Sequence, residues 1–254
     1  SPRKYVDKYP LDNIAMPASF ISEYPFNEAM NSGRKLRDER LAPFPRTEYS
    51  VKVNRQEYYA IITHMDAQIG RILDTLEASG QADNTYIFFT ADHGLAVGRH
   101  GLMGKQNMFD HSVRVPLMVV GPDVPKNTKI DARVYLQDVM ATSLELSGSK
   151  KPEYVQFESL LPLINGETDR GRDAIYGAYL QGQRMVIYGD YKMILYPSIS
   201  KAILYNIAKD PQELNDLAGQ KSHQPTLSKL FAKLMELQQE TGDELDLTKA
   251  FPNL

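Results

Sequence analysis

The sequence predicts an α/β protein in which part of a mixed, mainly parallel sheet flanked by helices precedes an antiparallel sheet covered by a helix. Between residues 54 and 120, a segment with helical apolar spacing is followed by a loop and then by two short runs rich in β-branched and aromatic residues. That order is typical of parallel α/β sheets. Residues 174–206 then resolve into short strands divided by turn residues, which predicts an antiparallel meander.

The first half of the chain contains one long predicted helix and two predicted strands. Residues 1–50 are rich in proline and show little periodicity, so we expect an irregular segment lying over a larger body. Apolar residues recur at helical spacing through 54–79, and Gly80 supplies a stop signal. Residues 85–91 form the first predicted strand, and residues 113–120 form a second, whose internal proline favours an edge or a bulge.

A change of pattern near residue 150 predicts a domain boundary. Residues 135–146 are expected to form a helix, and residues 148–158 form a linker. We therefore assign residues 1–150, including the irregular segment 1–50, to part of an α/β domain, and residues 151–254 to an antiparallel sheet subdomain with a terminal helix over 227–239. The expected strands of that subdomain are 174–180, 184–188, 192–196 and 202–206.

Composition excludes several classes of partner. The 254 residues include 42% hydrophobic residues, enough for one full core with a smaller appended layer. The 29 basic and 32 acidic residues give a net charge of −3, so neither nucleic acid nor a membrane surface is an expected partner. Because the chain has no cysteine, it has neither disulfides nor zinc-thiolate sites.

The end of the first predicted strand carries the strongest chemical signal. Asp92 and His93 follow the strand directly, at the sheet edge where open α/β proteins place their active sites. A carboxylate and a neutral imidazole can both bind a divalent cation, although the same pair can equally be a polar strand end capped by Asp92. Lys105 follows in a glycine-rich loop and would contact an anionic substrate there, or would simply be a solvated lysine.

Four further residues are candidates for the same site. His100 and His111 are candidate catalytic residues that would contact the substrate or protonate a leaving group, and the alternative for each is a loop histidine bonded to backbone. Gln183 and Arg184 lie near a predicted hairpin tip that would overhang the pocket and bind substrate. An ordinary hairpin is the favoured alternative for these two residues.

The segment from Asp92 to Gly94, together with Lys105, resembles the sulfatase family of the alkaline phosphatase-like superfamily. In that family an Asp-His/Asn-Gly sequence after a central strand binds the metal, and a lysine contacts the sulfate group. The resemblance extends from about residue 50 to residue 220 and includes the segments 58–70, 110–117, 191–194 and 204–211. It implies an alkaline phosphatase-like fold and sulfate ester hydrolysis by the intact protein.

The resemblance also implies components that this sequence does not contain. Family members carry an N-terminal Cys/Ser-x-Pro-x-Arg motif whose first residue becomes formylglycine, and neither cysteine nor that serine motif occurs here. We therefore expect the formylglycine on an absent N-terminal segment or a companion chain. This chain alone is expected to be inactive and to expose an apolar flank.

The family further implies a divalent cation, with calcium expected first and magnesium or manganese as alternatives. The implied substrate is a sulfated sugar or a small organic sulfate, and the family suggests a periplasmic or secreted location. Two alternatives to a sulfatase stay open. One is a phosphonate monoester or phosphodiester hydrolase of the same superfamily, and the other is a non-catalytic glycan-binding or structural module that keeps the fold.

Overall fold

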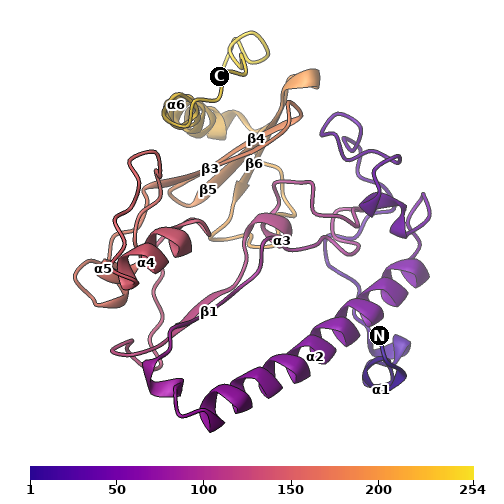
Figure 1. The fold of residues 1–254 in the computed structure, drawn as a ribbon. Helices are drawn as coiled ribbons and strands as arrows, with labels where there is room; N and C mark the ends of the chain where they lie inside the picture. The colour runs from indigo at the N-terminus through magenta and orange to yellow at the C-terminus, as the bar shows by residue number, and fades with distance from the viewer.

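The computed structural model describes the whole chain, Ser1–Leu254, and its longest element is helix α2, Glu48–Ala78. This helix crosses the full width of the first half of the molecule (Figure 1). It begins six residues before the predicted start, because Thr47 caps it and its side chain accepts a hydrogen bond from the Ser50 N–H at 3.2 Å. The Ser50 side chain in turn accepts from the Thr47 N–H at 3.3 Å, which completes a capping box.

Strands β1, Ile87–Thr90, and β2, Leu117–Val120, form a two-stranded sheet. They pair antiparallel, with Phe88 opposite Val119, so the parallel pairing expected from the element order is wrong for these two strands. Parallel pairing needs a crossover connection that packs on the sheet. The connection here runs back on itself and contains only the single helical turn α3, Asp110–Val113.

The second predicted strand starts later than expected. Residues 110–113 are helical rather than extended, and β2 begins only after Pro116, which lacks the N–H that a ladder requires. His111 therefore lies on helix α3 rather than at the entrance to a strand. This difference matters for the site, because a helical turn presents its carbonyl groups to the neighbouring loop.

The C-terminal half contains the predicted meander and its covering helix, which are confirmed. Consecutive antiparallel strands give the order β3-β4-β5-β6, and helix α6, Gln224–Glu240, lies on the outer face of that sheet (Figure 1). The strands are β3 Ala174–Tyr179, β4 Gln183–Tyr188, β5 Tyr191–Tyr196 and β6 Lys201–Asn206. Val186, Met193 and Leu204 face α6, whereas Met185, Ile194 and Ile203 face the rest of the chain.

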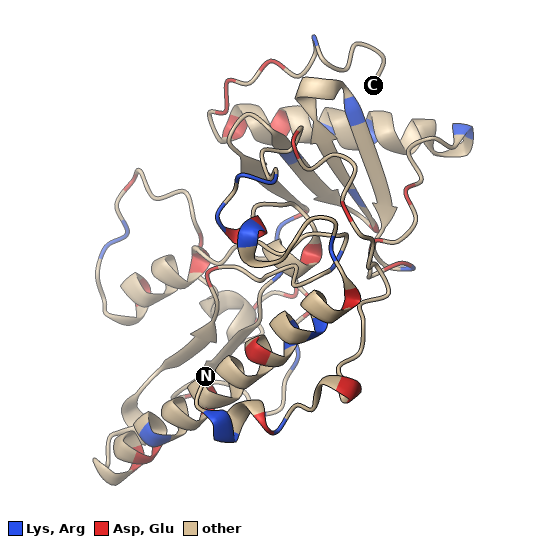
Figure 2. Ribbon diagram, turned by 90° about the vertical axis from the view of Figure 1, so that its right-hand side faces the viewer, with Lys and Arg blue, Asp and Glu red and all other residues tan.

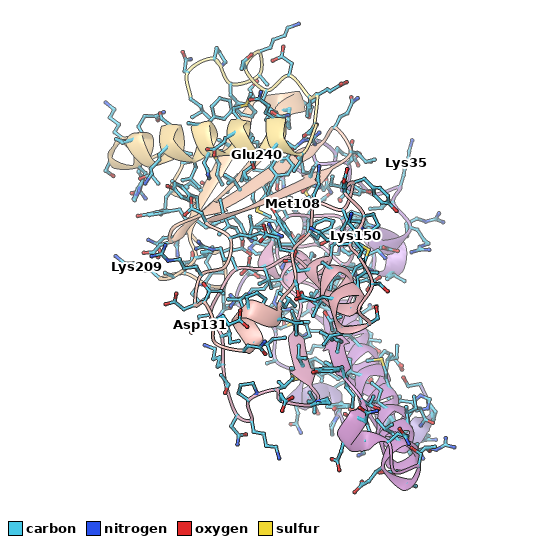
Figure 3. The ribbon with its side chains drawn as sticks, turned by 60° about the vertical axis from the view of Figure 1, so that its left-hand side comes forward. Lys35, Met108, Asp131, Lys150, Lys209 and Glu240 are labelled. Atoms are coloured by element: carbon cyan, nitrogen blue, oxygen red, sulfur yellow. The ribbon has the colours of Figure 1, made fainter.

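The inner face of this sheet shares its core with the first half of the molecule. Tyr24, Phe109 and Ile194 belong to one buried cluster, and the Tyr24 and Tyr196 hydroxyls lie 2.9 Å apart. Met108 lies between the sheet and the remaining elements (Figure 3). The irregular opening segment is confirmed and contains only the short helix α1 and two 3₁₀ turns, Arg3–Val6, Leu11–Asn13 and Asp38–Leu41.

The remaining helices are α4, Asp138–Leu146, and α5, Leu161–Ile164, with 3₁₀ turns at Ala82–Asn84, Pro197–Ile199 and Lys221–His223. The helix expected over 135–146 is thus confirmed, with a start three residues later. Asp138 explains that start, because its carboxylate accepts the Tyr135 N–H at 2.7 Å and holds the preceding residues in a turn.

An apolar flank is exposed along α2 and β2, as expected from the sequence. Ile72 on α2 is 67% exposed, and Val120 on β2 is 63% exposed. Acidic and basic residues are interspersed over the ribbon, with no face of a single sign (Figure 2). None of the helices combines the length and the apolar character needed to cross a membrane.

Candidate active site

The turn after β1 places Asp92 and His93 side by side. The His93 N–H donates to Asp92 Oδ1 at 3.0 Å, and His93 Nε2 lies 3.2 Å from Asp92 Oδ2. His93 Nδ1 donates to the Gly94 carbonyl at 2.9 Å, so Nε2 of the neutral ring carries a lone pair and can accept. The Asp92 side chain is 84% exposed, so its carboxylate is available to a ligand.

A tight hairpin returns Lys105 to this turn. Backbone hydrogen bonds join Ala96 N to Gly104 O at 3.0 Å and Gly98 N to Leu102 O at 2.8 Å. Gly98 has a φ of +94°, a conformation that L side chains rarely adopt, so the hairpin depends on glycine there. As a result Lys105 Nζ lies 2.6 Å from His93 Nε2, and the predicted meeting of Asp92, His93 and Lys105 is confirmed.

Two acidic residues of the opening segment support the hairpin, and the sequence did not indicate either of them. Glu39 is 1% exposed, accepts the Gly104 N–H at 2.8 Å and forms a buried ion pair with Arg46. Asp38 accepts from Gln106 Nε2 at 2.9 Å. The hydrogen bonds from Gln106 and Arg37 hold the pKa of Asp38 below its ordinary value, and the positive charge of Lys105 contributes.

His100 and His111 form an aromatic stack with Phe109. The His100 ring lies 4.0 Å from the Phe109 ring, and the His111 ring lies 5.5 Å from it. His100 Nε2 donates to the Glu213 carbonyl at 2.9 Å, whereas both ring nitrogens of His111 are buried without a partner in the chain. Burial lowers the pKa of both rings, and that of His111 falls well below its ordinary value.

The backbone of helix α3 lies against the Asp92–His93 turn. The Gly94 N–H donates to the Ser112 carbonyl at 2.8 Å. A side chain at position 94 would place its Cβ 2.0 Å from the His111 carbonyl oxygen, so only glycine fits there. His111 is therefore adjacent to the candidate metal ligands through its backbone, and as a neutral ring it offers one donor and one acceptor.

Gln183 and Arg184 point to opposite faces of strand β4. Gln183 is fully buried, and its Nε2 donates to the carbonyls of Met30 at 2.7 Å and Gln106 at 2.9 Å. Arg184 is held on the α6 side by Asp243, with Nη2 to Oδ1 at 2.9 Å, and its side chain is 5% exposed. The structure therefore brings Gln183 to the residue that follows Lys105 but does not bring Arg184 to the site.

The donor set near Asp92 is small for a divalent cation. No group of three or more His, Cys, Asp or Glu residues is placed to hold a metal ion. Asp92 and His93 nevertheless present a carboxylate and an imidazole lone pair to the same point, and these are chemically suitable ligands. The Lys105 ammonium now occupies the lone pair of His93 Nε2, so a cation bound by this pair would take the place of that contact.

Comparisons with known proteins relate the sequence and the fold of the chain to other proteins. The family profile described as sulfatase matches residues 14–149, and that described as N-sulphoglucosamine sulphohydrolase, C-terminal, matches residues 98–240. A curated sulfatase from Formosa agariphila is 31% identical over 219 residues, which cover 84% of this chain and 42% of that protein. The chain therefore spans less than half the length of this relative.

Two solved structures share the fold. The structure of a protein in complex with its substrate D-glucosamine-2-N,6-O-disulfate superposes with a TM-score of 0.73 at 26% identity, covering 80% of this chain and 44% of that one. A phosphonate monoester hydrolase from Silicibacter pomeroyi superposes with a TM-score of 0.81, covering 96% of this chain and 54% of that one. Its identity is 22%, so this second likeness concerns the fold alone.

Proposed function

The chain belongs to the sulfatase family, and on this premise we propose that the intact protein hydrolyses sulfate esters at a site that includes Asp92, His93 and Lys105. The observation that carries the proposal is the 2.6 Å contact between Lys105 Nζ and His93 Nε2 beside the exposed Asp92 carboxylate. A cation binder next to a fixed ammonium suits a substrate that carries a sulfate anion.

Asp92 and His93 are proposed as two of the metal ligands. Calcium is the first candidate, with magnesium and manganese as alternatives, and a bound cation would polarise the sulfate oxygens. Calcium binds about six to eight oxygens, so further ligands are needed beyond these two residues. No residue of this chain is assigned the role of the family's formylglycine.

Lys105 is proposed to contact the sulfate group and the bridging oxygen. Its ammonium is held by a hairpin whose backbone is fixed by Glu39, so the charge is in place before the reaction begins. Such preorganised charge stabilises the negative charge that develops as the ester bond breaks. We propose Lys105 as both the substrate-binding and the catalytic cation.

The roles of the two histidines differ in the support they receive. His111 has two unpartnered ring nitrogens, and its backbone carbonyl lies beside the Gly94 turn, which supports donation from the neutral ring N–H to a substrate oxygen. His100 is bound to the Glu213 carbonyl, which supports a structural role within the hairpin. Gln183 supports the loop after Lys105 by hydrogen bonding to backbone, and the pairing of Arg184 with Asp243 gives no support to substrate binding.

We propose a sulfated sugar or a small organic sulfate as the substrate. The solved relative in complex with a glucosamine disulfate supports the sugar, because its likeness covers most of this chain. The two alternatives are outcomes of one experiment on the intact protein, namely parallel hydrolysis of an aryl sulfate and an aryl phosphonate. A higher kcat/KM for the sulfate supports the proposal, a preference for the phosphonate supports a phosphonate hydrolase, and inactivity toward both supports a binding module.

A further inference from the structure

A buried ionic trio joins the C-terminal sheet to helix α3. Lys192 on strand β5 is fully buried, and its Nζ donates to Glu213 Oε1 at 2.6 Å, to the Met108 carbonyl at 3.1 Å and to Asp110 Oδ1. These contacts use all three ammonium hydrogens. We name the set Lys192, Asp110 and Glu213 the Lys192 clamp. Met108, whose carbonyl the clamp binds, lies between the sheet and the rest of the chain (Figure 3).

The composition of the clamp indicates a geometric role. Removing an ammonium and two carboxylates from water is unfavourable, and apolar residues of similar volume often stabilise a core as well or better. An ionic trio differs from apolar packing because its hydrogen bonds are directional, and each one fixes the position of one atom relative to another. The backbone of Glu213 has a φ of +56°, an uncommon conformation for a residue other than glycine.

Both sides of the candidate active site are attached to this clamp. On one side, Glu213 Oε2 accepts the Asp110 N–H at 2.8 Å and so fixes the first turn of helix α3. Ser112 lies in the same helix, and its carbonyl accepts the Gly94 N–H at 2.8 Å. On the other side, the Glu213 carbonyl accepts from His100 Nε2 at 2.9 Å and anchors the hairpin that carries Lys105.

We propose that Lys192 is a positioning residue for the site: by holding Asp110 and Glu213 together, it fixes the Gly94 turn and the Lys105 hairpin relative to each other. The catalytic consequence rests on the proposed function, whereas the positioning itself does not. A loosened clamp would leave Asp92, His93 and Lys105 present but misplaced, and a displacement of about 1 Å is enough to lower a catalytic rate about a hundredfold.

The test compares two double variants of the intact protein. The clamp variant is Lys192→Met with Glu213→Gln, which removes one cation and one anion together and leaves a carboxamide oxygen for the Asp110 N–H. The control is Arg184→Met with Asp243→Asn, which removes the buried pair on the opposite face of the same sheet, away from α3. Both variants are first compared by melting temperature, so that general destabilisation is measured in each.

The primary measurement is hydrogen exchange at the Gly94 amide, which needs neither metal nor activity. We expect exchange about tenfold faster in the clamp variant than in the control, after correction for global stability. We also expect kcat for an aryl sulfate to fall at least tenfold, with KM changed less than twofold. Equal exchange at Gly94 in the two variants overturns the proposal, because the clamp would then act on stability alone.

The single variant Glu213→Gln provides the same readout if the clamp variant does not fold. It keeps the carbonyl that binds His100, and it replaces the carboxylate that holds Lys192 and the Asp110 N–H with a neutral, weaker acceptor. Faster Gly94 exchange in that variant supports positioning, and unchanged exchange contradicts it. If Gly94 exchange changes as expected while no variant and no wild-type protein cleaves the aryl sulfate, then the proposed function has failed and the positioning role stands.

Discussion

The ammonium of Lys105 lies 2.6 Å from Nε2 of His93, although like charges would repel if both groups were protonated. The contact is possible because His93 Nδ1 carries a hydrogen bonded to the Gly94 carbonyl, which leaves Nε2 of the neutral ring as an acceptor. The same lone pair is the one that a metal would use. If His93 is a metal ligand, as we propose, its Nδ1 hydrogen bond already fixes the tautomer that a metal requires, and the Lys105 ammonium must leave Nε2 when the metal binds.

Loss of either candidate ligand is expected to weaken metal binding. In the intact protein, Asp92→Asn and His93→Gln should each raise the calcium dissociation constant at least about tenfold, measured by calorimetry. His64→Gln is the matched control, since that histidine stacks on Tyr5 in helix α1. The chain alone should bind calcium weakly, because it offers two ligands. Unchanged affinity in both site variants would exclude these residues as ligands.

The buried Glu39–Arg46 pair is expected to be essential to the hairpin. Glu39→Gln leaves the Arg46 guanidinium without its counter-ion in the core, so we expect a loss of about 3 kcal/mol in the free energy of unfolding, measured with urea. The control Arg37→Gln affects a pair in which the arginine side chain is 86% exposed. That variant should lose at most about 0.5 kcal/mol. Similar losses in both variants would refute the assignment.

Asp243 is expected to contribute stability that depends on pH. The hydrogen bond from Arg184 holds the pKa of Asp243 well below its ordinary value, so its contribution is present above about pH 4 and is lost as the pH falls through the folded-state pKa. Asp243→Asn should lower the free energy of unfolding by about 2 kcal/mol at pH 7 and by less at pH 3, measured by urea denaturation. An equal cost at both pH values would contradict the linkage.

His111 is expected to make the protein sensitive to mild acid. Burial lowers the pKa of this ring, so the stability that comes from its neutral form is present above about pH 6.5 and is lost as the pH falls. His111→Leu also removes two unpartnered buried nitrogens. Between pH 7 and pH 5, the free energy of unfolding of the variant should therefore fall by about 1 kcal/mol less than that of the wild type. Parallel stability profiles would show that His111 does not titrate in this range.

The part of the site that the sequence predicted is local. Asp92, His93 and Lys105 lie within one strand end and one hairpin, so glycine positions and residue spacing were enough to bring them together. The C-terminal meander was predicted for the same reason, because short turns join its strands.

The unpredicted parts depend on contacts between distant segments. Glu39 reaches Gly104 across 65 positions, and Lys192 reaches Asp110 across 82, which no local pattern indicates. Arg184 was predicted to lie near the site because it follows a hairpin tip. The alternation of side chains along β4 instead directs it to the face opposite Gln183, where Asp243 binds it. The prediction that β1 and β2 run parallel was wrong, because the order of elements along the chain does not specify how the connection between two strands returns.

The most direct test of the central proposal is the steady-state rate of aryl sulfate hydrolysis by the intact protein and its Lys105→Ala variant, with melting temperatures measured on the same samples. A loop lysine contributes little packing, so the melting temperature should stay within about 2 °C. The loss of charge stabilisation should lower kcat about a hundredfold to a thousandfold. Unchanged turnover in Lys105→Ala, or a loss of activity matched by a comparable loss of stability, would contradict the proposed role of the Asp92–His93–Lys105 site.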